Sequence, residues 1–281
     1  MPAEYGGETL PFLSNGLIRF TQPGAMNDPL ETRSFVDSTT IEEFTLYLDN
    51  FLQSDLSKVW NFVRPCREAK RMELPIHAAR YEMLKDFKEN REMFLKEQWD
   101  AIYRNRDDTC GILSLTENVT SSAMWSHYAS RHTGVAFGFD AKKIRQLSGR
   151  QRGFSDLRSV EYSDELSPLS MALGTKALPH NHFFRKSRDW RYEKEWRILV
   201  EFNEPLNGRV QTKLDRKDSN GHQIILIYLG HELIKEIRIG LLASRETEKR
   251  VLEYRDRAGR PIRIFKMKAS SSRFGLEAVP L

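Results

Sequence analysis

Residues 193–202 read EKEWRILVEF, and the segment from Trp196 to Phe202 is typical of a β-strand because apolar side chains recur at every second position. Successive side chains of a strand point to opposite faces. One face is therefore apolar and consists of Trp196, Ile198, Val200 and Phe202. The other face gathers Glu193, Glu195 and Arg197. Two interpretations follow: a solvated face whose charges pair with the next strand, or the wall of a cleft in which a carboxylate is held by its neighbours.

Further strand-like segments surround this stretch. They are Cys110 to Leu115, Gly134 to Phe139, Leu157 to Tyr162, Ile224 to Leu229, Ile237 to Ile239 and Ile262 to Phe265. Short helices are expected between them at about Ser121 to Ser130, Ser167 to Leu178 and Ser244 to Tyr254. The spacing is too irregular for a βαβ repeat. The sequence therefore predicts an α+β fold with a mixed, largely antiparallel sheet in the second half.

The first part of the chain is expected to contain a strand and a helical insertion. Leu17 to Phe20 is strand-like, which places Arg19 opposite its two apolar neighbours. Thr40 and Glu43 form a capping box ahead of a helix, and a second helical stretch runs from about Leu74 to Arg104. We predict a single domain over residues 1–281, with the helical insertion near residues 40–106.

Composition excludes several classes of protein. The 281 residues are 40% hydrophobic and 30% charged, which is enough apolar material for a sizeable core. Lys and Arg number 44 against 39 Asp and Glu, and this net charge of +5 favours solubility and weak steering but does not by itself indicate nucleic-acid binding, which stays possible. The longest apolar run, Ile224 to Leu229, is far shorter than the roughly 20 residues of a membrane-spanning helix. Acidic residues stand where a signal peptide carries basic ones, so a cytoplasmic protein is expected.

The cysteines and histidines do not form a metal-binding motif. Cys66 and Cys110 are far apart, and both are expected to be buried thiols. His127 and His132 are five residues apart, whereas helical metal pairs are separated by three or four. No bound metal is therefore predicted.

Aromatic residues are concentrated in two stretches. Trp125 and Tyr128 lie on the expected short helix beside His127, where they are either core residues or a platform on which a ligand stacks. Residues 183–192 interleave bases with aromatics, including Lys186, and this composition suits either contact with bases and phosphates or a surface helix. Asn27 and Asp28 precede Pro29, which predicts a turn and leaves these two residues as a possible site.

Several motifs together resemble one family. They are Ile18 to Pro23 with Asn27-Asp28-Pro29, Ser114 to Glu117, Met124 to Ala129 with His132 and Gly134, and Lys186 to Trp190 with Glu193 to Arg197. This set resembles the bacterial domain of unknown function 2971 over most of residues 10–240. The family name implies no activity. Its frequent occurrence near bacterial defence and mobile-element genes implies an effector that acts on a common cellular molecule.

A second, more distant similarity is to ADP-ribosyltransferases, whose plan is a first strand with Arg or His, a short helix ending at Gly, a second strand, and a late strand bearing Glu. Leu10 to Gly16 is similar to that helix and Leu17 to Phe20 to the second strand. The similarity implies that Glu195 stabilises an oxocarbenium-like transition state on NAD. The expected first strand lies before Leu10, where residues 3–7 provide no Arg or His.

The leading hypothesis is a cytosolic enzyme with NAD as donor substrate. Glu195 is its catalytic residue, and Trp125 and Tyr128 form an aromatic wall, with His127 beside them. Arg19, Arg197 and Lys186 are the predicted phosphate partners. One alternative is a module that binds or senses nucleic acid through residues 185–192. Another is a metal-dependent nuclease that requires Asp28, Glu117 and Glu193 to converge. The sequence leaves the oligomeric state open.

Overall fold

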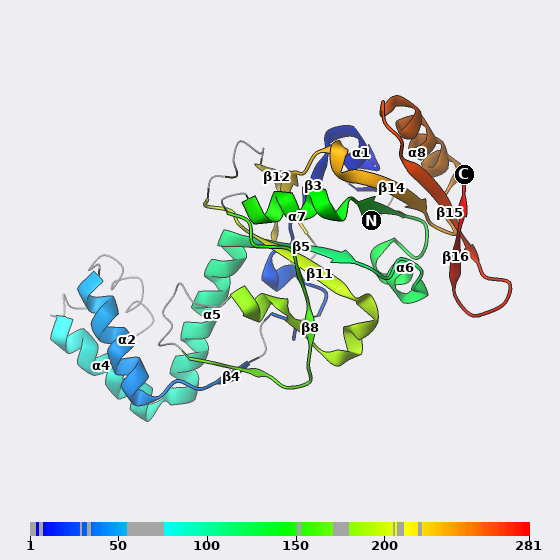
Figure 1. Ribbon diagram of the computed structural model, residues 1–281. Helices are drawn as coiled ribbons and strands as arrows, with labels where there is room; N and C mark the ends of the chain where they lie inside the picture. Colours follow the sequence, from blue (N-terminus) through cyan, green and yellow to red (C-terminus); the bar gives the residue numbers. More distant parts are fainter. Residues whose placement is uncertain are drawn as a thin grey trace.

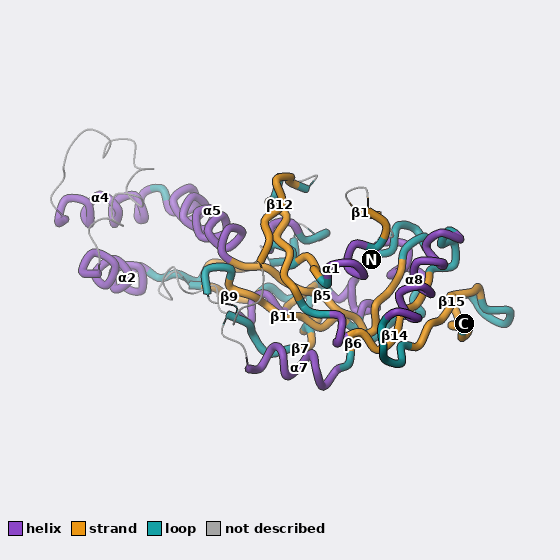
Figure 2. The backbone as a smooth tube through the Cα atoms, turned by 90° about the horizontal axis from the view of Figure 1, so that it is seen from above, coloured by secondary structure: helices purple, strands orange, loops and turns teal. Residues whose placement is uncertain are grey.

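A computed structural model describes residues 4–5, 8–28, 30–32, 35–54, 76–150, 153–170, 180–204, 206, 211–218 and 221–281. Helices and strands are both abundant, which confirms the α+β class. The sheets form one end of the molecule, and three helices, α2, α4 and α5, extend from it to the other end (Figure 1). The view from above shows the same separation (Figure 2).

The strand predicted over Trp196 to Phe202 is β11, Glu195–Glu201. It pairs antiparallel with β5, Cys110–Thr116, and with β7, Arg158–Ser159. The register places Glu195 opposite Thr116 and Arg197 opposite Ser114. The polar face of β11 is thereby fixed relative to the end of β5, which is the arrangement from which the candidate site is built.

A second sheet contains the strand predicted near the N-terminus. It has the order β12 (Gln211–Lys217), β13 (Gln223–Tyr228) and β3 (Leu17–Arg19), and all pairings are antiparallel. An isolated bridge between Thr21 and Ile112 joins the end of β3 to β5. Two backbone hydrogen bonds of 2.9 and 2.8 Å make this bridge. Arg19 is therefore held close to the sheet that carries Glu195.

The third sheet is the mixed one. Its order is β16 (Leu276–Pro280), β15 (Arg263–Ala269), β14 (Ile234–Ile239) and β6 (Val135–Phe139). Only β14 and β15 pair in parallel within it, and helix α8, Arg245–Arg257, connects these two strands. Val251 of α8 and Phe12 of the short helix α1, Pro11–Asn15, belong to the same apolar cluster as Ile237 of β14. This sheet, with its single parallel pair, bears out the predicted mixed and largely antiparallel topology.

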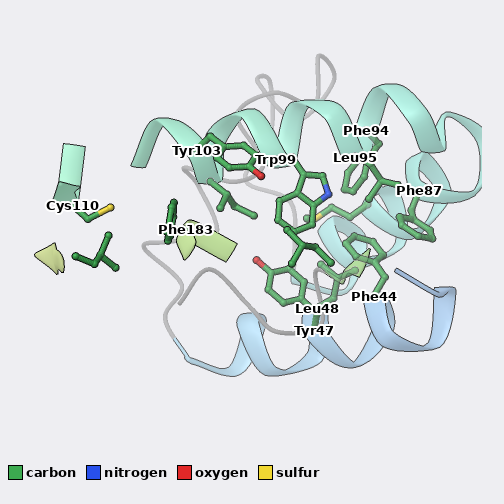
Figure 3. Packing of buried hydrophobic residues seen from close by; sticks show 14 of the residues in the cluster. Phe44, Tyr47, Leu48, Phe87, Phe94, Leu95, Trp99, Tyr103, Cys110 and Phe183 are labelled. Atoms are coloured by element: carbon green, nitrogen blue, oxygen red, sulfur yellow. The ribbon is translucent and has the colours of Figure 1, made fainter. Parts of the chain in front are cut away.

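In the described part of the predicted insertion there are three helices. They are α2 (Ile41–Ser54), α4 (Ile76–Glu89) and α5 (Arg91–Thr109). The Thr40–Glu43 capping box is confirmed, because each backbone N–H donates to the other residue's side-chain oxygen, at 3.0 and 3.1 Å. The second helical stretch, expected as one helix from Leu74 to Arg104, consists of two helices, α4 and α5, which are separated at Asn90. Phe44, Phe87 and Phe94 pack between the helices (Figure 3).

The remaining elements among the described residues have two to ten residues each. They are β1 (Glu4–Tyr5), β2 (Glu8–Thr9), β4 (Phe35–Asp37), α6 (Ser122–Tyr128), α7 (Ala141–Arg150), β8 (Glu161–Tyr162), β9 (Ser167–Leu169), β10 (Arg185–Lys186) and four 3₁₀ turns at Pro23–Ala25, His180–Phe184, Arg188–Glu193 and His231–Leu233. Both β4–β9 and β10–β8 are parallel pairs.

Two further predictions about secondary structure need correction. The strand expected over Leu157 to Tyr162 is two short strands, β7 and β8. The helix expected from Ser167 is wrong at its start, because Ser167–Leu169 is a strand that pairs with β4; residues 171–179 lie outside the described residues. Cys110 is buried as predicted, whereas Cys66 also lies outside the described residues. No helix in the described ranges has the length and apolar character needed to cross a membrane.

Candidate functional site

A cavity of about 1270 Å³ lies where the strands of the three sheets meet helix α6. Its walls include Arg19 from β3, Trp125 and Tyr128 from α6, and Glu195 from the start of β11. Lys186 and Glu193 also line it. The cavity therefore brings together six charged or aromatic side chains from segments that are far apart in the sequence.

Glu193 and Glu195 converge on Lys186 although only Glu195 belongs to the strand. Glu193 ends the 3₁₀ turn, and Lys194 between them has the left-handed conformation with φ 47°. The predicted shared strand face is therefore wrong for Glu193, which reaches the same place through a reversal of the chain. The Lys186 ammonium donates to Glu193 Oε2 at 2.7 Å and to Glu195 Oε2 at 3.3 Å.

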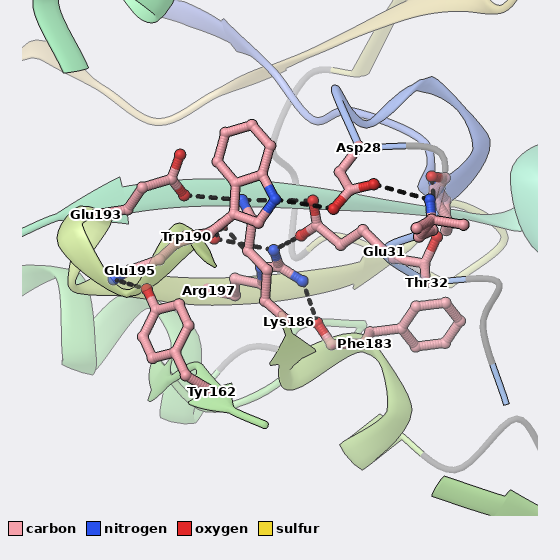
Figure 4. A network of polar contacts seen from close by, with 12 residues as sticks. Asp28, Glu31, Thr32, Tyr162, Phe183, Lys186, Trp190, Glu193, Glu195 and Arg197 are labelled. Atoms are coloured by element: carbon pink, nitrogen blue, oxygen red, sulfur yellow. Dashed lines mark hydrogen bonds and ion pairs between the residues drawn. The ribbon is translucent and has the colours of Figure 1, made fainter. Parts of the chain in front are cut away.

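Arg197 lies behind Glu195 and fixes it. Its Nε and Nη2 atoms donate to Glu195 Oε1 and Oε2 at 2.8 and 2.9 Å, and its Nη1 donates to the carbonyl of Phe183 at 2.7 Å. The backbone N–H of Glu195 donates to the hydroxyl of Tyr162 at 2.8 Å. The Arg197 side chain is 1% exposed and does not line the cavity. Its position is that of a residue that orients Glu195, which it contacts through both carboxylate oxygens (Figure 4).

Glu31 completes the network and was missed by the sequence interpretation. Its carboxylate is 1% exposed, and it forms ion pairs with Lys186, at 3.4 Å, and with Arg197. The only signal in the sequence was its position three residues after Asp28, in a segment that is otherwise typical of a turn.

Helix α6 positions the two aromatic side chains of the wall. Ser121 caps the helix by accepting from the Met124 N–H, and Trp125 Nε1 donates to the carbonyl of Val119 at 2.7 Å. The Tyr128 hydroxyl donates to Glu193 Oε1 at 2.6 Å. Both aromatic residues thus have satisfied polar atoms, as the core interpretation requires, and both line the cavity, as the ligand-stacking interpretation requires.

An unusual turn follows α6. Ser130, Arg131 and His132 all have positive φ, at 47°, 53° and 69°. Such residues are strained, and the turn persists only where the surrounding contacts stabilise it. The Leu242 N–H donates to the carbonyl of His132 at 3.0 Å, and a Cβ on Gly240 would lie 2.2 Å from the same oxygen. A glycine at position 240 is therefore needed to seat this turn, and with it α6, against the third sheet.

The electrostatics of the network differ from those of a solvated sheet face. Burial raises the pKa of Glu195 to about 7, although the nearby Lys186 charge and the Ser114 hydroxyl oppose this shift. Burial alone would lower the pKa of Lys186, but Glu195 and Glu193 together raise it. Burial lowers the pKa of Arg197 to about 9, so that it remains protonated at neutral pH. The network therefore contains two permanent cations and a carboxylate that titrates near neutrality.

The other predicted residues lie around this centre. Trp190 Nε1 donates to Asp28 Oδ2 at 2.8 Å, and the Lys186 ammonium lies 4.6 Å from the centre of the Trp190 ring. Asn27 hydrogen-bonds the Tyr128 side chain and lines the cavity. His127 packs edge-on against Trp190, with ring centres 6.3 Å apart, and does not line the cavity. Asn27 and Asp28 thus contact residues of the network in addition to forming the expected bend.

Arg19 lies in the cavity wall. Its Nη2 atom is 2.6 Å from Asp218 Oδ2, whereas its buried Nε has no hydrogen-bond partner among the described residues. The Arg19 guanidinium thus adds a positive charge to the cavity wall beside Asp218.

The two alternative functions depend on other groups of residues. In residues 183–192, Phe183, Phe184 and Lys186 are buried, and Arg188 pairs with Asp164. Trp190 and Tyr192, the aromatic residues of the proposed contact stretch 185–192, are half-buried, and their ring centres are 6.1 Å apart. For the nuclease, no three His, Cys, Asp or Glu side chains in the described part of the chain are arranged to hold a metal ion. The Glu117 carboxylate instead accepts from Trp196 Nε1 at 2.7 Å.

One family model matches part of the chain. Residues 124–198 match the family model described as "Protein of unknown function (DUF2971)", which supports over this segment the resemblance predicted for most of residues 10–240. The matched segment contains α6, Lys186, Glu193, Glu195 and Arg197. Neither the curated proteins nor the solved structures include a match to this chain. The similarity to ADP-ribosyltransferases is therefore not shown by these comparisons.

Proposed function

We propose that the protein is an enzyme that cleaves the bond between nicotinamide and ribose in NAD, with Glu195 as the catalytic carboxylate. One observation carries this proposal: Glu195 is only 4% exposed, is held at both oxygens by Arg197, and lines a cavity of about 1270 Å³ together with Trp125 and Tyr128. A fixed carboxylate in a dry wall, beside aromatic rings, suits a reaction that develops positive charge on a sugar.

The proposed chemistry needs few groups. The bond between C1′ of the ribose and the ring nitrogen breaks, and the electron pair leaves with nicotinamide. The positive charge that develops on the ribose is stabilised by the ionised carboxylate of Glu195. A nucleophile, either water or the hydroxyl, amine or guanidine of an acceptor, then forms the new bond to C1′ and loses a proton. Arg197 acts as a positioning residue, because it contacts Glu195 and does not line the cavity.

Other features of the cavity suit a dinucleotide. Arg19, Arg145 and Arg238 line the walls and supply positive charge for phosphates, and each of Arg19 and Arg238 also pairs with one carboxylate, of Asp218 and of Glu236. The rings of Trp125 and Tyr128 provide apolar surface for a flat heterocycle. Lys186 has a different role from the predicted phosphate contact, because its ammonium is already surrounded by Glu31, Glu193 and Glu195.

Nucleic-acid binding without catalysis is the less favoured function, because Lys186 is buried and its charge is paired. The family resemblance also implies a role in bacterial defence, and this role is part of the same proposal: cleavage of NAD would serve defence.

The test is nicotinamide release from NAD by the wild type and by Glu195→Gln. The substitution removes one charge at nearly constant volume, and we expect a loss of at least 100-fold in rate with the fold retained in circular dichroism. Glu161→Gln is the matched control, because Glu161 is 71% exposed on β8, which pairs with β10, and its substitution should leave the rate unchanged. Absence of nicotinamide release from the wild type, or equal rates for wild type and Glu195→Gln, would reject the proposal.

A further inference from the structure

The buried network has more carboxylates than cations. Three carboxylates, Glu31, Glu193 and Glu195, contact two cations, Lys186 and Arg197. All five side chains are at most 4% exposed. When every group is ionised, the network has one negative charge in excess. Uncompensated charge in a buried place is costly, so a further positive charge would stabilise it.

The excess is greatest on the side that a ligand meets. Glu31, Glu193, Glu195 and Lys186 line the cavity, whereas Arg197 lies behind them. The Lys186 ammonium is surrounded by acidic and aromatic groups. It lies 2.7 to 3.4 Å from three carboxylates and 4.6 Å from the centre of the Trp190 ring. The polar wall of this end of the cavity is therefore acidic.

Aromatic rings lie in the same wall. Tyr128 is in contact with the network through its hydroxyl, which donates to Glu193, and Trp125 is on the same side of α6. The faces of such rings attract cations as well as flat apolar surfaces. Carboxylates and aromatic rings on one wall together favour a flat group that is itself positively charged.

We propose that this end of the cavity recognises a planar organic cation of the ligand, namely a pyridinium or a guanidinium. The inference rests on the proposed function and specifies the group of the substrate that the site selects. A pyridinium is the charged ring of NAD itself, and a guanidinium is the side chain of an arginine acceptor. The remaining walls, with Arg19, Arg145 and Arg238, suit the negative phosphates of the same dinucleotide.

The raised pKa of Glu195 is consistent with this inference. Near neutral pH a proton on the carboxylate supplies part of the positive charge that the network lacks. The groups facing Glu195 are Lys186 on β10, Arg197 on β11, Glu193 in the 3₁₀ turn, Glu31, Ser114 on β5 and the Tyr162 hydroxyl on β8. A bound cation would take the place of the proton, so binding at pH 7 should release protons.

The test compares ligands that differ in charge but hardly in shape. Titration calorimetry gives the dissociation constants of NAD⁺ and NADH, and separately those of benzamidine, which is a cation, and neutral benzamide. Within a pair that binds, we expect the compound with the positively charged group, NAD⁺ or benzamidine, to bind at least ten-fold more tightly than its neutral counterpart. Repeating the titration in two buffers detects the proton release. Equal affinities or a preference for the neutral member would overturn the inference, as would failure of all four compounds to bind at millimolar concentration.

Two further arms keep this inference separate from the proposed function. If NAD⁺ and NADH both fail to bind, NAD cleavage is rejected, and the benzamidine pair alone decides whether the site selects a cation. Glu31→Gln leaves two carboxylates and two cations in the network, so the negative excess is lost. The ten-fold preference should then fall to about two-fold or less. If that variant does not fold, the wild type at pH 5.5 replaces it, because protonation of Glu195 should likewise weaken the preference relative to pH 8.5. An unchanged preference in that arm would overturn the assignment to this network.

Discussion

Arg197 binds both carboxylate oxygens of Glu195, at 2.8 and 2.9 Å, although the two residues are only two positions apart on the same strand. The planar guanidinium lies along the polar face of β11 and orients its neighbour by two parallel hydrogen bonds. The third nitrogen is used on the carbonyl of Phe183. Arg197 therefore fixes both the direction of the Glu195 carboxylate and the segment that precedes Lys186.

Removal of this guanidinium should be strongly destabilising. We expect Arg197→Met to lower the free energy of unfolding by about 3–5 kcal/mol, because it leaves buried carboxylates without their partner. Arg197→Lys should retain part of this stability, since an ammonium keeps the charge but cannot span two oxygens. Urea denaturation measures both. Arg188→Met is the matched control: the Arg188–Asp164 pair is 64% and 59% exposed, and its loss should cost less than about 1 kcal/mol. Similar losses for Arg197→Met and Arg188→Met would contradict the assigned role.

The pKa of Glu195 predicts how stability depends on pH. The pKa is raised from 4.5 to about 7 in the folded protein, so between these values the folded state binds a proton that the unfolded state has lost. The free energy of unfolding should therefore fall as pH rises through this window, by at most about 1.4 kcal/mol per pH unit for one group. Glu195→Gln should remove this component of the slope. Denaturation at pH 5, 6, 7 and 8 tests it, and an identical slope in the wild type and the variant would refute it.

The same titration should appear in catalysis. The proposed reaction uses the ionised carboxylate, so kcat/KM for nicotinamide release, which reports the ionisation of the free enzyme, should increase as pH rises through about 7. A bound cationic substrate stabilises the ionised form, so the profile of kcat should lie at lower pH than the profile of kcat/KM. The two profiles are measured with the wild type alone. A rate that falls with pH across this range would show that Glu195 acts as a proton donor rather than as the stabilising anion.

Local patterns in the sequence predicted the elements but not the network. The alternation in residues 196–202 and the Thr40–Glu43 capping box are local signals, and both appear in the structure. Glu31 was missed because its partners, Lys186 and Arg197, are distant in the sequence. No local pattern distinguishes a glutamate that will be buried with two cations from one on a solvated turn.

Two errors arose where local sequence patterns do not report the structure. Ser167–Leu169 forms a parallel strand pair with Phe35–Asp37, and the helical spacing of the sequence does not reveal such a distant partner. Lys194 adopts the left-handed conformation although it is not glycine, so the chain reversal that separates Glu193 from β11 had no signature. Of the candidate site, the sequence therefore indicated which residue types were present, whereas the cavity and its charge depend on contacts between distant segments.

Tyr128 should contribute to stability through its hydroxyl and to binding through its ring. Tyr128→Phe removes the 2.6 Å hydrogen bond to Glu193 and leaves a buried carboxylate oxygen with one partner fewer, so we expect a loss of about 1–3 kcal/mol in the free energy of unfolding. The ring remains, so the dissociation constant of benzamidine should change less than three-fold. Tyr128→Ala should lose both the stability and the binding. Thermal denaturation and calorimetry separate the two effects, and equal binding by Tyr128→Ala and the wild type would exclude a contact between ring and ligand.

Arg19 should contribute to the binding of phosphates and not to recognition of the ring. Its guanidinium lies in the cavity wall, where Nη2 is 2.6 Å from Asp218 Oδ2, and its positive charge would attract a ligand phosphate. A charge-assisted hydrogen bond contributes about 1.5–3 kcal/mol, so Arg19→Gln should weaken ADP-ribose and NAD⁺ by about ten-fold or more and leave benzamidine unchanged. Arg245→Gln, an exposed arginine at the start of α8, is the control that removes the same charge away from the cavity. If Arg19→Gln weakens benzamidine as much as ADP-ribose, the substitution has deformed the cavity and Arg19 is not a phosphate partner.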